Sequence, residues 1–359
     1  MRAMIAKEFR ELRRDRRTVA MMILLPAVLL IVFGYAANFS VQHIPTVVTG
    51  PAARQVATLL PRPAFRVSDV DPAAGQQAAR DKVRDGQAIV AVVTGGSSPL
   101  VLLDGTQLFS AEAAERALAT AARPGTTPAP KVQILYNPRL TTSWVMVPGL
   151  AGLILVFIGT LITSLGVVRE RQSGTLEQLA VMPLRARDVI AGKIAPYLMV
   201  AAADLVLVVL IGMGVFGVPF AGNVAVFALG AALFLLVTLG MGVLVSTVSQ
   251  NQGQAIQLAF MILLPQVLLS GLIFPISAMA AGVRWISYVL PLTYFIDISR
   301  GVMLKAAPLS ALWQPLGLLA LLAVVVLGAA IARFRRDLAP ARRRARGPAA
   351  ARTEETAAA

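Results

Sequence analysis

Side chains able to perform chemistry are sparse in this sequence of 359 residues. Cysteine is absent and His43 is the one histidine, which excludes disulfides, thiolate metal sites and any reaction that needs two imidazoles. Acids such as Asp69, Asp81 and Asp104 are scattered, and no serine and acid accompany His43. The sequence also lacks the G-x-x-x-x-G-K-[ST] pattern of a phosphate-binding loop. We therefore expect no catalytic site, no cofactor and no metal in the chain, and predict that it is not an enzyme.

The elements that carry these few groups are unusually apolar. Hydrophobic residues make up 57% of the chain and charged residues 14%, whereas soluble domains carry about 25% charged residues. Too few polar side chains are present to cover a globule, so the composition predicts an α-helical integral membrane protein. The net charge of +15 could indicate nucleic-acid binding, but in a membrane protein the placement of the basic residues matters more than their number.

Six stretches are long and apolar enough to cross a bilayer core, which needs about 20 residues. The charge-free stretch from Leu205 to Val283 is too long for one helix, and polar breaks near 218–223 and 246–254 divide it. The first stretch could instead be a cleaved signal peptide, although its apolar run is longer than usual for one. The predicted transmembrane helices cover residues 18–37, 146–168, 194–216, 223–246, 255–274 and 313–332.

The distribution of lysine and arginine predicts the orientation. With the amino terminus inside, the short inner segments hold 20 basic residues and the short outer segments hold 3. Because basic loops stay on the cytoplasmic side, we expect a multi-pass membrane protein with both termini in the cytoplasm. Residues 1–17 are predicted to form an amphipathic connector helix on the inner surface of the lipid bilayer. Residues 336–359 are expected to be a basic, disordered tail attracted to anionic lipid, not to nucleic acid.

Residues 38–145 form a polar insertion large enough to fold independently. Its β-rich runs alternate with alanine-rich stretches that carry charges at helical spacing. This alternation predicts a small α/β extracytoplasmic domain inserted after the first span. The β-rich runs are 45–49, 88–94, 101–103 and 132–136, and the helical patterns are 52–60, 73–84 and 111–122.

Two further features lie near the membrane. Segment 275–312 is rich in aromatic residues and is broken at Pro291, which predicts an outer re-entrant segment of two short amphipathic helices that dip into or lie on the outer interface. Anchoring at that interface is one interpretation, and closing an outer gate through Pro291, Tyr294, Phe295 and Arg300 is the other.

Asp204 is an acid inside the third predicted span. We expect it to face protein or a water-filled pathway, where it either joins helices or contacts the transported molecule.

The inner loop at 169–193 is the most informative segment. Arg169 and Glu170 begin it, Gly174 can end the descending helix, and Thr175 can cap a new helix that continues through Leu176. Glu177 would then place negative charge near the positive end of that helix. The result would be a short cytoplasmic helix joined stiffly to two spans, a geometry suited to docking a soluble partner.

This loop resembles the signature loop of ABC transporter type-2 permeases. The resemblance begins with Glu170–Leu179 (ERQSGTLEQL) and continues through Met182–Leu184 and Gly192–Lys193. It extends in order over nearly the whole chain, but it does not cover the tail, and residues 38–145 match in position more than in residues. The long segment after the first span is similar to that of bacterial multidrug or unknown-substrate exporters. The other matching stretches are Asn137–Arg139 with Val147–Leu150, Ser270–Pro275, and Leu290–Phe295 with Arg300–Gly301.

The resemblance implies a permease subunit of an ATP-driven efflux complex in the bacterial inner membrane. Two permease subunits, identical or paralogous, would pair, and two copies of a separate ATP-binding subunit would bind ATP and Mg²⁺ and drive them. Arg169, Glu170, Gly174, Thr175, Leu176 and Glu177 would couple hydrolysis to transport. The apolar spans favour hydrophobic or amphipathic substrates moving out of the cytoplasm or inner leaflet.

Two alternatives stay open. A permease-like subunit could use ATP to signal or to act on envelope components without exporting a solute. An ion-coupled secondary transporter would need ionisable groups at the bilayer midplane, and Asp204 is the one acid inside the predicted spans.

Overall fold

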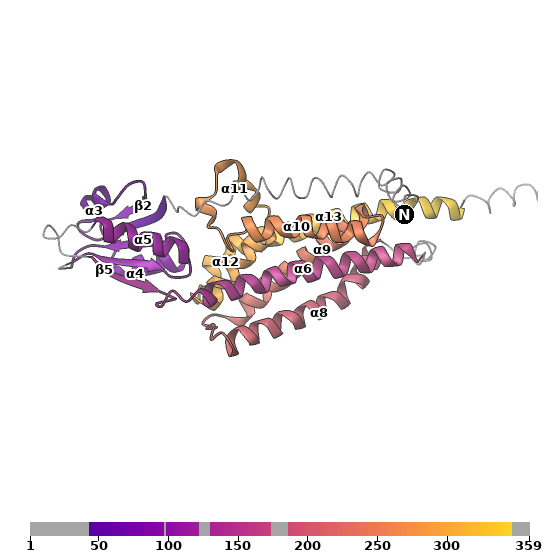
Figure 1. Cartoon of the computed structure of the whole chain (residues 1–359), viewed down its shortest axis with the longest axis horizontal. Coiled ribbons are helices and arrows are strands. Elements are labelled where there is room, and N and C mark those ends of the chain that lie inside the picture. Colours follow the sequence, from indigo (N-terminus) through magenta and orange to yellow (C-terminus); the bar gives the residue numbers. More distant parts are fainter. Residues whose placement is uncertain (1–42, 97, 122–129, 174–185, 347–359) are drawn as a thin grey trace, which may run out of the picture.

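The computed structural model describes residues 43–96, 98–121, 130–173 and 186–346. Within these ranges a sheet-containing domain lies at one end of a bundle of long helices (Figure 1). The connector helix predicted at 1–17 and the first span predicted at 18–37 lie outside the described residues. The mostly helical, membrane-type character predicted from composition is confirmed by the helices described next.

Among the described residues, five helices are long and apolar enough to cross a membrane. Such helices satisfy every backbone polar group internally, which lipid requires. They match the second to sixth predicted spans in order, while the total of six spans stays a prediction. The helices are α6 (Thr142–Gln172), α8 (Ala186–Gly214), α9 (Val224–Val248), α10 (Gln252–Leu269) and α13 (Leu309–Arg346).

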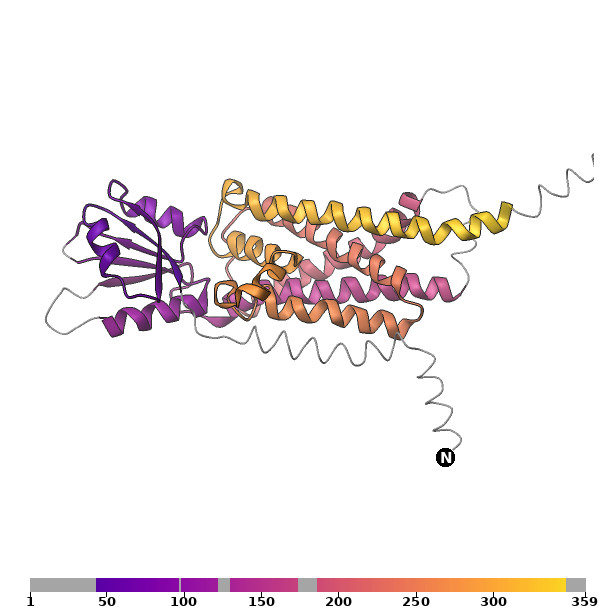
Figure 2. The same ribbon diagram turned by 90° about the horizontal axis from the view of Figure 1, so that it is seen from above.

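Three helix ends differ from the sequence prediction by five residues or more. Helix α8 begins at Ala186, eight residues before the predicted start at 194. Helix α10 ends at Leu269, five residues early, because Gly271 takes a φ of +84° that ends the helical run before Pro275. Helix α13 continues to Arg346 and runs past the rest of the bundle (Figure 2). Part of the tail expected to be disordered is therefore helical, since its alanine and arginine residues favour helix. Residues 347–359 lie outside the described part.

The domain at the end of the bundle is built on a five-stranded sheet of order β2-β1-β3-β4-β5. All neighbouring strands are parallel except β3 and β4, which are antiparallel. Strand β2 was not predicted from the sequence. About half of its residues are polar, and they do not alternate cleanly with buried apolar residues. The strands are β1 (Ile44–Thr49), β2 (Phe65–Asp71), β3 (Val90–Val93), β4 (Leu100–Asp104) and β5 (Lys131–Leu135).

Alternation along the strands divides the core of this domain between the two faces of the sheet. Val90 and Val92 pack on one face with residues of α3 (Ala53–Leu59) and α5 (Leu108–Ala121). Ala91 and Leu102 pack on the other face with α4 (Gln76–Arg84). Helices therefore cover both faces, and the carboxyl end of β4 is left to meet the helical bundle.

The segment predicted to dip into or lie on the outer interface enters the bundle. Short helix α11 (Ala281–Ser287) precedes α12 (Pro291–Met303), and Pro291 starts α12 as predicted for a break there. Twelve of the thirteen residues of α12 are buried, leaving Asp297 exposed, and the helix packs against α6, α9 and α13. Protein therefore surrounds α12 on nearly all sides, and the helix does not lie on the surface of the bundle. That segment 275–312 is re-entrant and dips into the outer interface stays a prediction.

Candidate functional site

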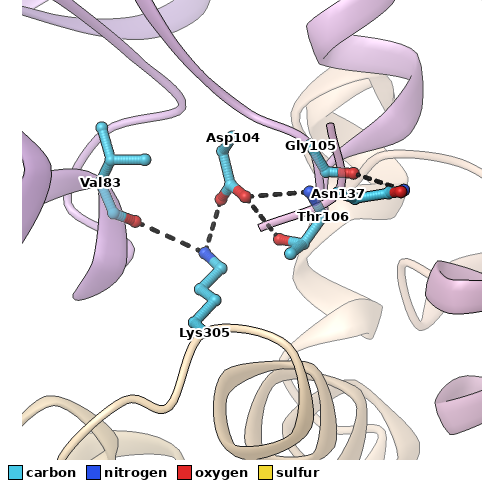
Figure 3. A network of polar contacts seen from close by, with 6 residues as sticks. All are labelled: Val83, Asp104, Gly105, Thr106, Asn137 and Lys305. Carbon is cyan, nitrogen blue, oxygen red and sulfur yellow. Dashed lines mark hydrogen bonds and ion pairs between the residues drawn. The ribbon is translucent and has the colours of Figure 1, made fainter. Parts of the chain in front are cut away.

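The turn after β4, residues Asp104–Thr106, joins the sheet domain to the helices, and we call it the docking turn. Asp104 Oδ1 accepts hydrogen bonds from the backbone N–H of Thr106 at 3.0 Å and from its hydroxyl at 2.6 Å. Asp104 Oδ2 forms an ion pair at 2.5 Å with Nζ of Lys305, from the loop between α12 and α13 (Figure 3). The side chains of Lys305 and Asp104 are 9% and 2% exposed, so this pair is nearly sealed from water.

The docking turn is also held to the start of α6. Asn137 Nδ2 donates to the carbonyl oxygens of Gly105 at 3.3 Å and of Thr141 at 3.1 Å, and its Oδ1 accepts from the Thr141 N–H at 2.9 Å (Figure 3 shows the Gly105 bond). A Cβ on Gly105 would lie 2.8 Å from the Asn137 carbonyl oxygen, so the close approach requires glycine. One turn therefore contacts both α6 and the α12–α13 loop.

Tyr136 flanks the same junction. Lys305 Nζ lies 5.9 Å from the centre of the Tyr136 ring and 3.5 Å from the Val83 carbonyl oxygen. Burial, together with the charge of Asp104, raises the pKa of Tyr136 to about 12. Tyr136 and Ala306 both take positive φ values, +66° and +49°. Such backbone conformations cost about 1–2 kcal/mol in non-glycine residues, so packing at the junction holds both residues in place.

The four residues predicted to form an outer gate lie together in or at the start of α12. Phe295 stacks on Phe234 of α9, with ring centroids 4.3 Å apart. The Tyr294 hydroxyl donates to the Tyr288 carbonyl oxygen at 2.5 Å, and Pro291 occupies the first turn, where its missing N–H is no loss. These contacts place α12 between the bundle and the preceding loop, and their role as a gate stays a prediction.

Arg300 forms its hydrogen bonds outside α12. Its Nε donates to the Val145 carbonyl oxygen at 3.1 Å, and its Nη1 lies 3.5 Å from the Gly271 carbonyl oxygen. The residue is 6% exposed. Arg300 therefore ties α12 to the start of α6 and to the end of α10.

Two glycines of α6 allow close packing, Gly152 against α12 and Gly149 against the segment after α10. A Cβ added to Gly152 would lie 2.5 Å from Phe295 Cδ1 and 2.7 Å from Leu292 Cδ1. A Cβ on Gly149 would lie 2.3 Å from Leu272 Cδ1. Small residues let helices in a membrane approach closely. Gly152 therefore brings the backbone of α6 into direct contact with side chains of α12.

The opposite end of α6 carries the start of the predicted coupling segment. Arg169 is exposed and Glu170 is half-buried, while Gly174, Thr175, Leu176 and Glu177 lie outside the described residues. Arg171 Nη1 donates to the carbonyl oxygens of Ser246 and Ser249, both at 3.1 Å, and thereby caps the last turn of α9. Gln252 at the start of α10 donates to Gln172 at 3.2 Å. The end of α6 is thus fastened to both α9 and α10.

Asp204 lies within α8 with a partly exposed side chain. Within the described ranges no hydrogen bond or ion pair is formed by Asp204, and α8 is the least buried of the candidate spans. The expectation that Asp204 faces protein or water is left as a prediction.

Sequence reasoning missed the residues that join distant segments. Lys305 and Asp104 are 201 residues apart, and no local pattern indicates such a pair. Arg171 could have been singled out as a basic residue in the last turn of a helix. His43 is exposed before β1, and the described residues contain no group of His, Cys, Asp and Glu able to hold a metal ion.

Comparisons with known proteins identify the family of the chain. The family described as "ABC-2 family transporter protein" matches residues 16–332. The chain is 36% identical over 203 residues to "Probable multidrug ABC transporter permease YbhR" of Escherichia coli, which covers 56% of the chain and 55% of that protein. It is 27% identical over 339 residues to "Probable multidrug ABC transporter permease YbhS", with 85% and 88% covered.

A more distant relative is "Inner membrane transport permease YhhJ" of Escherichia coli, 29% identical over 58% of the chain and 56% of that protein. The chain therefore spans about half the length of some relatives and most of another. The family match covers most of the chain, from the predicted first span to Ala332 within α13. It includes α6, whose carboxyl-terminal end is bonded to α9 and α10, and α12, which leads to the docking turn. The chain belongs to the ABC-2 family of transporter proteins.

Proposed function

We propose that this chain is the membrane-spanning permease subunit of an ATP-driven exporter that moves a hydrophobic or amphipathic substrate out of the cytoplasm or inner leaflet. The observation that carries the proposal is α6 within a chain of the ABC-2 family. This continuous helix of 31 residues has the predicted coupling segment at one end and α12 packed against the other. A displacement at its inner end must therefore reach α12.

The fastening of α6 supports transmission of force. Arg171 and Gln172 connect the end of α6 to α9 and α10, so a push at the coupling segment would move three helices as a unit. A separate ATP-binding subunit, in two copies, would supply that push and would hold ATP and Mg²⁺. Its contact would be Arg169, Glu170 and the following residues to Glu177, on the cytoplasmic side.

The apolar character of the bundle supports the proposed substrate class. A cavity of about 660 Å³ lies between α8 and α9 and is lined almost wholly by aliphatic and aromatic side chains, among them Leu198, Val206, Phe220 and Phe227. Such a cavity can take an acyl chain or an apolar drug, and it offers no hydrogen-bond partner for a strongly polar solute. The names of YbhR and YbhS as multidrug permeases agree with this class.

We further propose that the chain works with a second permease subunit, with both termini in the cytoplasm and the sheet domain outside. Because the chain lacks cysteine, a Gln76→Cys variant on exposed α4 carries a single thiol. A membrane-impermeant maleimide should label that thiol in intact spheroplasts. Labelling only after lysis would contradict the topology.

The coupling role is tested with Glu177→Arg, which reverses a charge at the proposed contact outside the bilayer. The variant should insert and assemble normally but lose co-purification with the ATP-binding subunit, or hydrolyse ATP without transport. Gln178→Arg, at the neighbouring position, serves as the matched control for added positive charge. Normal binding and normal transport by Glu177→Arg would move the contact elsewhere, to residues 1–17 first.

Export itself is tested by reconstituting the permease with its ATP-binding subunit in proteoliposomes. Amphipathic test substrates should stimulate ATP hydrolysis and be transported in an ATP-dependent way. ATP hydrolysis that responds to envelope components, without movement of any solute, would favour the signalling alternative.

A further inference from the structure

A cavity of about 320 Å³ lies beside the docking turn, between the sheet domain and the helices. Its size is at the lower end of the range for small-molecule sites. The sheet domain contributes Arg84, Asp85 and Gln107, while Leu312 and Leu318 of α13 form an apolar wall. The cavity therefore has one polar side and one apolar side, which suits an amphipathic molecule.

The charged groups that line this cavity are not equally available. Arg84 forms ion pairs with Asp81 at 3.1 Å and Asp85 at 2.9 Å. Lys305 is paired with Asp104, as described above. These pairs neutralise one another and leave little charge for a ligand.

Arg300 and Asp297, one helical turn apart, differ from those pairs. The Arg300 guanidinium is buried and directed to the carbonyl oxygens of Val145 and Gly271. Asp297 is the exposed residue of α12 and lines the cavity, and among the described residues no hydrogen bond or ion pair is formed by its carboxylate. Asp297 is therefore the carboxylate of the lining whose hydrogen-bonding oxygens are available to a ligand, although the positive charges of Arg300 and Lys305 act on it.

Two tyrosines complete the lining. Tyr288 and Tyr294 both border the cavity, and the Tyr294 hydroxyl is already used in its bond to the Tyr288 carbonyl oxygen. Their rings are left as aromatic surfaces close to Asp297, and an organic cation is attracted both by a carboxylate and by the face of an aromatic ring.

We propose that this cavity is a binding site for an amphipathic organic cation, with the ammonium group on Asp297 and the apolar part against Leu312, Pro315 and Leu318 of α13. The proposal deepens the export function and rests on it, since the cavity would hold the exported molecule where it leaves the helices for the sheet domain. Arg84, Lys305 and Arg300 are satisfied by other partners, so the site does not favour an anion.

The test is equilibrium binding to the purified full-length permease in nanodiscs, without ATP or the ATP-binding subunit. The probes are dansylcadaverine, an amphipathic primary amine, and its neutral N-acetyl derivative, followed by dansyl fluorescence. Asp297→Asn removes the charge with little change in shape. Asp85→Asn is the matched control, because it removes a carboxylate from the same cavity that is already paired with Arg84.

We expect the amine to bind more tightly than its N-acetyl derivative, and Asp297→Asn to weaken the amine by about tenfold, the size of a hydrogen bond to a charged group. Asp297→Glu should retain binding, and Asp85→Asn should change it by less than about threefold. If Asp297→Asn does not fold, Ala311→Trp, which fills the cavity from α13, should abolish binding of the amine. Equal binding of both probes by the wild type, or unchanged binding by a folded Asp297→Asn or Ala311→Trp variant, would overturn the proposal.

The outcome is separable from that of the proposed function. Binding to the isolated permease with no transport in proteoliposomes would refute export and leave the site in place. ATP-dependent transport of an uncharged substrate, with no binding of the amine, would refute the site and leave export in place.

Discussion

The ion pair between Lys305 and Asp104 offers a sharp test, because the chain contains its own control. Lys82 and Asp69 form a second pair at the same Nζ–Oδ2 distance of 2.5 Å. The side chains of Lys82 and Asp69 are 21% and 52% exposed, whereas those of Lys305 and Asp104 are 9% and 2% exposed. Lys305→Met and Lys82→Met therefore remove the same charge at the same distance and differ in burial.

The expected magnitudes differ by several kcal/mol. Removing Lys305 leaves Asp104 buried with only the hydrogen bonds from Thr106, and breaking a buried pair in this way costs about 3–5 kcal/mol. Removing Lys82 breaks an exposed pair, which costs about 0–1 kcal/mol because water screens it. In the Lys305→Met variant the sheet domain can separate from the helices, which lets water hydrate Asp104. The variant therefore cannot be destabilised by more than the free energy that holds the sheet domain on the helices.

The assay combines thermal unfolding of the purified protein with limited proteolysis near the docking turn. Lys305→Met should lower the unfolding temperature and speed cleavage at this junction, while Lys82→Met should leave both close to wild type. Adding Asp104→Asn to Lys305→Met removes the unpaired charge and should recover part of the loss. Equal effects of the two lysine variants, or a double variant as unstable as the sum of its parts, would refute the argument that burial makes this pair important.

Four other predictions follow from the geometry. Gly152→Ala should destabilise the protein by about 1–3 kcal/mol, because the new methyl group meets the Phe295 ring, whereas Gly317→Ala, with open space around it, should be neutral in the same thermal unfolding measurement. The pKa of Tyr136 is about 12 in the folded protein and about 10 in the unfolded chain. The neutral phenol therefore stabilises the fold below pH 10, and this stabilisation is lost as the pH rises towards 12. Tyr136→Phe should flatten that part of a pH–stability profile. Arg171→Gln should insert normally but reduce substrate-stimulated ATP hydrolysis, since it loses charge-assisted bonds worth about 1.5–3 kcal/mol, and an unchanged rate would show that the tie to α9 does not transmit force. Asp204→Asn should retain transport if the side chain only joins helices, and lost transport at normal expression would place Asp204 in the pathway.

The long helices could be predicted from the sequence because lipid imposes a simple rule. Apolar length alone identified α6, α8, α9, α10 and α13 to within a few residues at most ends. Four strands and three helices of the sheet domain also coincide with runs of β-rich or helical pattern. In each case the signal is local, since it depends on residues within one element.

What could not be predicted depends on contacts between distant segments. Helix α12 has a strong amphipathic pattern, and its burial becomes evident only when α6, α9 and α13 surround it. Lys305 looks like an ordinary basic residue in a polar loop until β4 brings Asp104 to it. The predicted gate residues all lie in α12, but the partners of Arg300 on α6 and after α10 could not be predicted from local pattern.

The two ties at the docking turn determine how α12 could move in a transport cycle. Helix α12 is packed against Gly152 of α6 at one side and leads into Lys305, which is bound to Asp104. The same turn is bonded through Asn137 to the start of α6. If α6 and α12 move together, both ties survive and the sheet domain must travel with them as a rigid body. If they separate, one of the two ties must break, and the buried ion pair costs more to break than the neutral hydrogen bonds of Asn137. We therefore expect a gate that opens by separation of α6 from α12 to release the sheet domain from α6 first, while it stays attached to α12.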